Sequence, residues 1–411
     1  MHDTTTQRFP WVGLFTLSAL VFASVTSEFL PTGLLPDMAR ELDVTESQVG
    51  LLITLFAGTV VVTAAPLAVL TRRFARKSLL LVVLGLFIVA NVLSAFAPTY
   101  EVLAGSRVIG GLTHGLFWSI VGAYAAHLVP KKRLGRAVAI VSGGGTAAFV
   151  LGVPLGTALG HALGWRLAFA FIAGMMAVLL IVAIRFVPSV QHIEPLKTGE
   201  IALPIRKDRT IPGVVFVCLM VFALMFAHNI FYTYIAPFLI GPVGVDPGGV
   251  AGILLLYGLA GAVGLALAGV FSDRFPRASL PVAGILIAVS VLVLGLAPGQ
   301  FWAAMVAFVV WSIAFGGIPA MLQTQMMHVA SVRVRDVASA YQTTAFNAAI
   351  GSGALVGGIL LDRVGLFVLP FADVAITVLG VLLAIVGGAW WRRREASWRV
   401  ASSSTPIQPK P

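Results

Sequence analysis

The chain has 411 residues, of which 59% are apolar and only 10% are charged, with a net charge of +11. An average soluble domain has roughly 25% charged residues, and so few charges cannot cover a water-soluble surface. The composition therefore excludes a soluble enzyme and leaves a protein that crosses a membrane several times.

Apolar runs long enough to cross a bilayer recur along the whole chain. A spanning helix needs about 20 mostly apolar residues. The runs are too long and alternate too little for a barrel, so they predict helices. The first run is too long for a signal peptide and has no small-residue cleavage site before Glu28. The twelve predicted spans are Trp11–Leu35, Glu46–Leu70, Ser78–Ala97, Glu101–Leu128, Arg136–Gly160, Trp165–Val187, Ile211–Ile240, Gly248–Phe271, Ser279–Ala297, Gln300–Val329, Val337–Leu361 and Pro370–Trp391.

Basic residues are unevenly divided between the two sides of such a protein. If the N-terminus is cytoplasmic, 23 of the 27 Lys and Arg residues lie on its side. Arg40, Arg166 and Arg363 lie on the other side, and Arg107 lies within a span. This asymmetry predicts that both termini are in the cytoplasm. It also indicates that the positive charge reflects membrane topology and not nucleic-acid binding.

The chain repeats itself at an offset of 201 residues. The stretch 71–79 aligns with 272–280, Gly152 and Gly156 align with Gly353 and Gly357, and Pro36 aligns with Pro237. A constant offset implies two parallel six-helix repeats, with a ligand site between them near the midplane. We expect an all-α membrane protein of twelve transmembrane helices. Its expected parts are a cytoplasmic segment 1–10, a first half 11–187, a cytoplasmic linker 188–210, a second half 211–391 and a cytoplasmic tail 392–411.

Short motifs in the expected order carry a family resemblance. Ser272-Asp273-Arg274 resembles the loop motif of the major facilitator superfamily, and Arg107-Val108-Ile109-Gly110-Gly111 resembles its helix-4 motif. The stretch Gly152-Val153-Pro154-Leu155-Gly156 resembles the helix-5 motif of its drug:proton antiporters. The resemblance covers essentially the whole chain and is strongest to bacterial sugar-efflux transporters, through blocks at 27–29, 114–119 and 346–351.

The resemblance also assigns gating residues. In the first-half loop Arg72 and Ala75 stand where the family pattern has Asp and Gly, so an Asp-based inner gate is expected in the second half. Gly152, Pro154 and Gly156 fit either ordinary tight packing or a bend that seals the interface between the halves, as the resemblance implies. The gating set also includes Arg73, Asp273 and Arg274.

Glu28 is the only acid that the predicted spans place deep in the membrane. With a rise of ~1.5 Å per residue, Glu28 lies ~10 Å and Arg107 ~9 Å below the same membrane surface, so an ion pair is geometrically possible. Intramembrane acids are usually functional, which favours Glu28 as a proton acceptor. The alternative is a static pair that joins the first helix to the fourth.

His114 shares a helix face with Arg107, Gly111 and Trp118, at spacings of four, three and four. A histidine at mid-depth can exchange a proton in the physiological range. We expect His114 to couple protonation to closure, with Asn347 of the other half as its hydrogen-bond partner. The alternative is a neutral histidine bonded to a backbone carbonyl.

Aromatic and amide side chains within the spans suit a sugar, because rings stack on its apolar face and amides bind its hydroxyls. They also suit a small amphipathic drug. The candidate substrate-binding residues are Ser24, Thr32, Phe117, Trp118, Asn229, Tyr232, Gln323, Gln342, Thr343 and Phe346.

The sequence contains no Walker A loop, no nucleophile elbow and no metal-binding His or Cys pattern, so we expect no enzyme activity, no cofactor and no metal. Energy must then come from a gradient. We expect a monomeric, proton-coupled exporter of sugars or small neutral or amphipathic compounds in the cytoplasmic membrane. Its expected partners are a small-molecule substrate, protons and membrane lipid. The open alternatives are an importer or uniporter with the same parts, or a non-transporting receptor or scaffold.

Overall fold

The computed structural model describes residues 10–71, 74–129, 133–188, 208–331 and 333–403, and these residues form helices and connecting turns without any strand. The helices of the first half are α1 (Trp11–Glu41), α2 (Glu46–Leu70), α3 (Arg76–Ala95), α4 (Tyr100–Leu128), α5 (Leu134–Ala147), α6 (Val153–Leu163) and α7 (Trp165–Phe186). Those of the second half are α8 (Ile211–Tyr232), α9 (Ile235–Ile240), α10 (Val250–Arg274), α11 (Ser279–Leu296), α12 (Phe301–Gly316), α13 (Ile318–Val329), α14 (Arg335–Arg363) and α15 (Leu369–Ser403).

All twelve predicted spans are helical. Eleven helical segments of the described residues are long and apolar enough to cross a membrane. The remaining predicted span is α4, a helix of 29 residues that contains Glu101 and Arg107. The chain is therefore a multi-pass membrane protein, as the composition predicts. The predicted linker lies almost entirely at 189–207, outside the described residues.

Three spans are interrupted where proline removes a backbone donor. A π-helical segment, Ala148–Gly152, separates α5 from α6 and ends two residues before Pro154. The helix breaks between α8 and α9 at Thr233, whose carbonyl is the one that Pro237 cannot bond. The break between α12 and α13 falls at Gly317, two residues before Pro319. Each break divides one span into two helices without ending it.

The first helix is longer than predicted. It continues past Leu35 to Glu41 although Pro31 and Pro36 lie inside it. A tight turn follows in which Asp43 has a φ of 53°, and Thr45 and Gln48 then form a reciprocal capping box at the start of α2. The side chain of Thr45 accepts from the backbone N–H of Gln48, and the Gln48 side chain accepts from that of Thr45. This turn fixes α1 and α2 as antiparallel neighbours.

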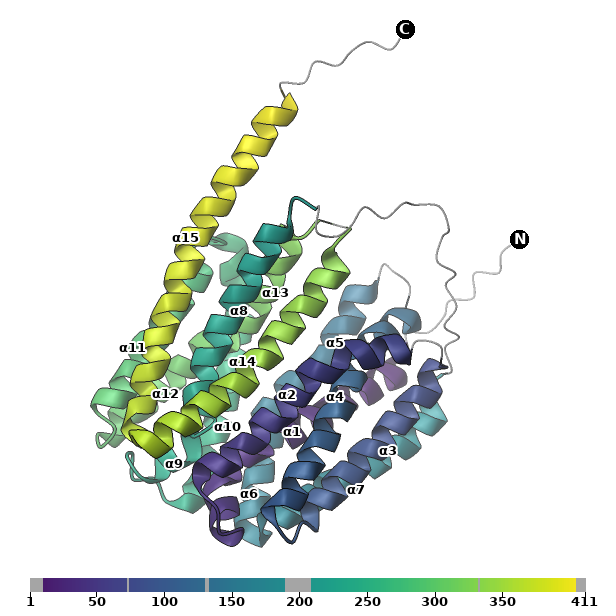
Figure 1. Ribbon diagram of the computed structural model, residues 1–411, viewed down its shortest axis with the longest axis vertical. Coiled ribbons are helices and arrows are strands. Elements are labelled where there is room, and N and C mark those ends of the chain that lie inside the picture. Colours follow the sequence, from purple (N-terminus) through teal and green to yellow (C-terminus); the bar gives the residue numbers. More distant parts are fainter. Residues whose placement is uncertain (1–9, 72–73, 130–132, 189–207, 332, 404–411) are drawn as a thin grey trace.

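The two halves lie side by side, with α2 and α14 along their contact (Figure 1). We call the end of the bundle where α1 begins and α15 leaves it the terminal end, and the opposite end, with the α1–α2 turn, the far end. The upper part of α15 projects beyond the other helices at the terminal end (Figure 1).

The halves contact each other mainly toward the far end. Ser47 Oγ donates to Asp362 Oδ2 at 2.6 Å, and Thr54 Oγ1 donates to the carbonyl of Gly351 at 2.9 Å. Both donors lie on the first third of α2, whose buried residues end at Val60 although the helix runs to Leu70. The halves are therefore joined at the far end and separate toward the terminal end.

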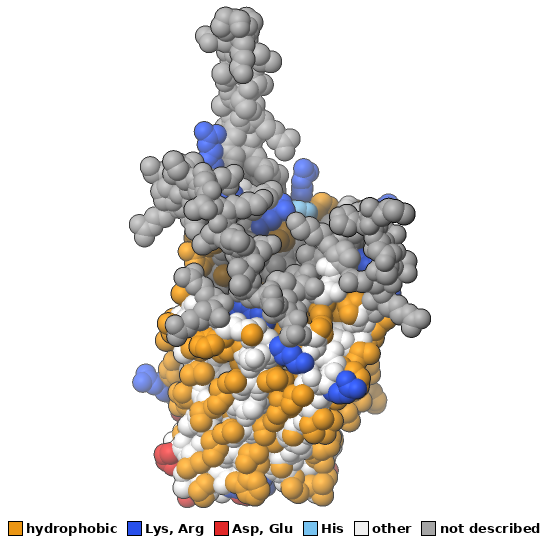
Figure 2. Space-filling model, turned by 90° about the vertical axis from the view of Figure 1, so that its right-hand side faces the viewer, with side chains coloured by type: hydrophobic (Ala, Val, Ile, Leu, Met, Phe, Trp, Pro, Cys, Tyr) orange, Lys and Arg blue, Asp and Glu red, His pale blue; other side chains and the backbone are white. Residues whose placement is uncertain are grey.

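The outer surface is the apolar belt that a bilayer requires. Large hydrophobic side chains such as Phe171, Ile181 and Val270 are more than 60% exposed. Figure 2 shows hydrophobic side chains over much of the described part of the visible face, with Lys and Arg mostly toward the terminal end. Lipid replaces water around such a surface, so this exposure costs nothing in a membrane.

Candidate proton and substrate site

The candidate site is built around the middle of α1. Every residue from Ala23 to Leu35 is buried, including Ser24, Ser27, Glu28 and Thr32. α1 packs against α2, α4, α5, α6 and α7, which makes it the central helix of the first half. The sequence thus places a carboxyl group where water does not reach it from any side of the helix, and this position demands nearby polar partners.

Arg107 is fastened to the backbone of α1. Its two terminal nitrogens donate to the carbonyls of Ser27 and Glu28, each at 2.9 Å, and its guanidinium lies 4.5 Å from the ring centre of Phe56. The carbonyl of Ser27 is available because the residue four positions later is Pro31, which has no N–H to donate. The structure therefore brings Glu28 and Arg107 together, but the guanidinium hydrogen-bonds to the carbonyls of α1 and not to the Glu28 carboxyl group.

His114 links α4 to the acid. Its Nδ1 lies 2.8 Å from Ser24 Oγ, its Nε2 lies 3.5 Å from Glu28 Oε2, and the indole N–H of Trp118 donates to Nε2 at 2.6 Å. An indole N–H can only donate, so Nε2 must carry a lone pair and Nδ1 the hydrogen. The assigned tautomer is thus a neutral imidazole that donates to Ser24. A neutral, protonated Glu28 fits beside the lone pair of Nε2, whereas the negative charge of a carboxylate would be repelled by it.

A second polar layer lies behind Glu28, and sequence reasoning missed it. Ser27 Oγ donates to Asn91 Oδ1 of α3 at 2.7 Å, and Asn91 Nδ2 donates to the carbonyl of Phe87 at 2.9 Å. Ser94 and Ser106 form a further bond at 2.7 Å between α3 and α4. Asn91 is the one amide in its apolar run, and that isolation was the available signal.

Asn347 does not bond to His114 in this arrangement. Its amide nitrogen donates to the carbonyl of Thr343, one turn earlier in α14, at 2.9 Å. Both ring nitrogens of His114 have partners on α1 and α4 instead. The expected bond between the halves is therefore not among the hydrogen bonds of the described residues, because helix α14 satisfies its own amide.

The candidate substrate residues fall into three groups. Trp118 is 37% exposed, and Gln323 and Thr343 are also exposed. Phe346 is half-buried. The buried candidates are Ser24, Thr32, Phe117, Asn229, Tyr232 and Gln342. The ring contacts and hydrogen bonds of Ser24, Phe117, Asn229 and Tyr232 are with residues of their own half.

Gly152 and Gly156, the glycines of the predicted fifth span, pack within the first half. A Cβ at Gly152 would lie 2.0 Å from Thr26 Oγ1, and one at Gly156 would lie 2.7 Å from Leu30 Cδ1. Both partners belong to α1, so these glycines let α6 and the π-helical segment approach α1 closely. The contact with the second half is made next to them, where Gly258 of α10 meets the backbone of Phe149 and Val150.

The gating set is only partly described. Arg72 and Arg73 lie outside the described residues. Asp273 and Arg274 end α10 at the terminal end and are exposed, with the Arg274 guanidinium 5.8 Å from the ring centre of Phe275. In this arrangement these two residues stand where the halves have separated.

One sequence-based expectation needs correction. Glu28 is not the only acid buried in a span, because Asp373 in α15 is 0% exposed. Asp373 follows the predicted start of its span by only three residues, so a count from the apolar run placed it near the membrane surface. Packing against α8 and α11 buries it completely.

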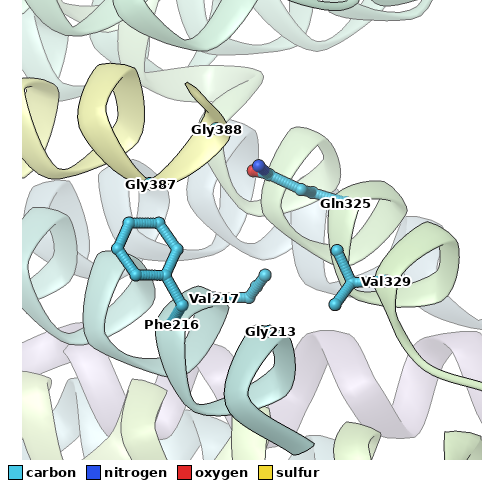
Figure 3. Close-up of a pocket in the computed structure, with 7 residues that line it drawn as sticks. All are labelled: Gly213, Phe216, Val217, Gln325, Val329, Gly387 and Gly388. Atoms are coloured by element: carbon cyan, nitrogen blue, oxygen red, sulfur yellow. The ribbon is translucent and has the colours of Figure 1, made fainter. Parts of the chain in front are cut away.

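A small cavity elsewhere is lined by apolar groups and one amide. It lies between α8, α13 and α15, and its lining residues are Gly213, Phe216, Val217, Gln325, Val329, Gly387 and Gly388 (Figure 3). The Phe216 ring points toward Gly387, where a Cβ would lie 1.7 Å from it. None of the candidate substrate or proton-coupling residues lines this cavity, so it is separate from the site around Glu28.

Comparisons with known proteins agree on one family. Residues 17–351 and 217–411 match the model described as Major Facilitator Superfamily. A probable sugar efflux transporter of Helicobacter acinonychis is 33% identical over 371 residues, which cover 90% of this chain and 93% of the relative. One from Mannheimia succiniciproducens is 31% identical, covering 92% of this chain and 94% of the relative.

Solved structures share the fold at lower identity. A D-xylose–proton symporter has a TM-score of 0.76 at 18% identity, and covers 92% of this chain and 97% of its own. An inward-facing bacterial homologue of the human lysosomal transporter Spinster has a TM-score of 0.74 at 17% identity, with 93% and 97% covered. These likenesses support the arrangement of twelve helices in two repeats.

Proposed function

Since the chain belongs to the Major Facilitator Superfamily and is a transporter rather than an enzyme, we propose that it exports sugars or similar small neutral compounds in exchange for protons. The observation that carries this proposal is the hydrogen-bonded chain Ser24–His114–Trp118, which runs from buried Ser24 and His114 to the exposed Trp118, with buried Glu28 beside it. Buried ionisable groups in a membrane protein are costly and mark proton or ion pathways.

The proposed coupling step uses the contacts of His114. In the described arrangement Trp118 occupies Nε2, so the proton remains on Glu28. A substrate that stacks on the exposed Trp118 ring draws the indole away from Nε2. The freed nitrogen, 3.5 Å from Glu28 Oε2, takes the proton and passes it to the open terminal end. The substrate-loaded protein then opens at the far end, where reprotonation of Glu28 favours the return.

The substrate class is inferred from two sources. The curated relatives bear the name probable sugar efflux transporter. The exposed Trp118 ring supplies a surface on which a neutral sugar can stack, and the exposed amide of Gln323 supplies hydrogen-bonding groups. Buried charge is scarce, which argues against a doubly charged substrate such as a phosphate ester.

Orientation and assembly belong to the same proposal. The excess of Lys and Arg at the terminal end supports a cytoplasmic location for both termini in a bacterial inner membrane. The described arrangement then faces the cytoplasm. We propose a monomer as the working unit, because the polar site lies inside one chain.

The first test is transport in proteoliposomes with an imposed proton gradient and labelled arabinose, a galactoside or chloramphenicol. Wild type should move at least one of them against its concentration, and Glu28→Gln and His114→Ala should lose this gradient-driven movement by at least tenfold. The matched control is Asp43→Asn, because Asp43 is an exposed acid in the α1–α2 turn and asparagine tolerates its positive φ.

The outcomes separate the alternatives. Movement down a concentration gradient that ignores the proton gradient would indicate a uniporter. Proton-driven uptake with the same residue dependence would indicate an importer. If no compound is moved and none raises the unfolding temperature of the purified protein, the proposed export of sugars is wrong.

A further inference from the structure

Asp373 is a second buried acid that the coupling step above does not use. It is the fifth residue of α15, ~6 Å along the helix from its start at the far end. The hydroxyl of Thr377 donates to Oδ1 at 2.8 Å, and Oδ2 is buried without a hydrogen-bond partner. None of the ion pairs found between described residues includes Asp373.

Among the described side chains, the helices around Asp373 bring no cation within ion-pair distance of it. α11 and α12 contain no titratable residue. α8 contributes His228 and Tyr232, with Cys218 further along it, and α10 contributes Tyr257, with Asp273 and Arg274 exposed at its opposite end. On α14, Asp362 binds Ser47 of the first half and Arg363 is exposed at the helix end. A carboxylate in such surroundings is stable only when a proton neutralises it.

A cluster of aromatic side chains extends from α8, which packs against α15, to the interface between the halves. Tyr257 lies 5.1 Å from Tyr232 and 5.4 Å from Trp311 between ring centres. The Tyr257 hydroxyl, Trp311 Nε1 and His228 Nδ1 are all buried without partners. Tyr257 directly precedes Gly258, which contacts the π-helical segment of the first half. A movement of the halves therefore changes the surroundings of Tyr257 and, through Tyr232 on α8, those of the part of α15 that holds Asp373.

We propose that Asp373 is a second proton-binding site, in the second half, that is loaded and unloaded as the halves move. The ligand is a proton and not a metal ion, because the described residues contain no group of three or more His, Cys, Asp or Glu side chains. One carboxylate with a free oxygen is sufficient for a proton, which binds Oδ2 and leaves without any other bond changing. This inference rests on the proposed function, and it predicts two protons for each neutral substrate.

The test is the coupling ratio in proteoliposomes with the membrane potential held at zero. The substrate concentration ratio that stops net flux is measured against the imposed pH difference. In the wild type, net flux should stop at a substrate concentration ratio of about 100 per unit of pH difference, the value for two protons. In Asp373→Asn it should stop at a ratio of about ten, the value for one proton. Asp373→Glu keeps an acid and should retain the wild-type ratio, and Asp43→Asn is the exposed control.

A wild-type ratio of about tenfold per pH unit would overturn the proposal, even if Asp373→Asn fails to fold. An unchanged ratio in a folded Asp373→Asn variant would do the same and leave Asp373 as a permanently protonated structural group. Both results are distinct from failure of the proposed function, in which flux would not respond to the proton gradient at all.

Discussion

At the residue scale, the proline in α1 explains why Arg107 is held where it is. Pro31 leaves the carbonyl of Ser27 without its helical donor, and Arg107 supplies one across the helix interface. The same side chain bonds to the Glu28 carbonyl. The positive charge next to Glu28 is therefore positioned by the backbone of α1 and does not depend on the carboxyl group being ionised.

This relation predicts a coupling between Pro31 and Arg107 in stability. Arg107→Ala leaves buried carbonyls unpaired, at a cost of about 1–3 kcal/mol each. In a Pro31→Ala background the helix supplies its own donor to Ser27, so the same change should cost less. A double-mutant cycle on thermal unfolding in detergent should give a coupling of about 0.5–3 kcal/mol. Additive effects would show that Pro31 does not set the role of Arg107.

At the element scale, small residues decide how closely helices approach. Gly152 and Gly156 fit against α1 within the first half, whereas Gly258 fits α10 against the other half. Prolines bend or divide α5–α6, α8–α9 and α12–α13 without ending the spans. Besides α2 and α14, the elements that meet between the halves are α6 and the π-helical segment of the first half with α10 of the second, and α1 with α9.

Gly258 should be sensitive to one added methyl group. A Cβ there would lie 2.5 Å from the Phe149 carbonyl oxygen and from Val150 Cα, and backbone atoms cannot turn aside. The matched control is Gly252→Ala in the same helix, where a Cβ meets nothing within 4 Å. Both changes gain similar helix propensity. Gly258→Ala should be less stable than Gly252→Ala by about 1–3 kcal/mol and should therefore unfold at a lower temperature. Equal unfolding temperatures would mean that the halves do not press together there.

At the scale of the whole molecule, two hydrogen bonds hold the far end closed. Ser47 and Thr54 of α2 bind Asp362 and the Gly351 carbonyl of α14. Alternating access requires both bonds to break in each cycle, because α2 and α14 belong to different halves. The polar site around Glu28 lies inside the first half and can keep its internal bonds while this happens.

A disulfide across the far end should therefore stop transport. In a Cys218→Ala background, Ser47→Cys with Asp362→Cys joins two positions whose side-chain oxygens are now 2.6 Å apart. Oxidation should reduce transport at least tenfold, and a reducing agent should restore it. Asp208→Cys with Ser331→Cys is the matched control, because those side-chain oxygens are 2.8 Å apart within one half. Undiminished transport by the oxidised Ser47–Asp362 pair would contradict movement of the halves at this end.

The sequence by itself determined the helical spans, the repeat and the family, because hydropathy, charge placement and motif order depend on which residues follow one another. It also selected Glu28, Arg107 and His114, since ionisable groups in apolar runs are conspicuous. Only the tertiary structure decided the partners. Helix packing turned the Arg107 side chain to backbone carbonyls, occupied His114 with Ser24 and Trp118, kept Asn347 within its own helix and buried Asp373 near the end of a span. Hydrogen bonds depend on which helix faces meet, and spacing along one helix does not specify that.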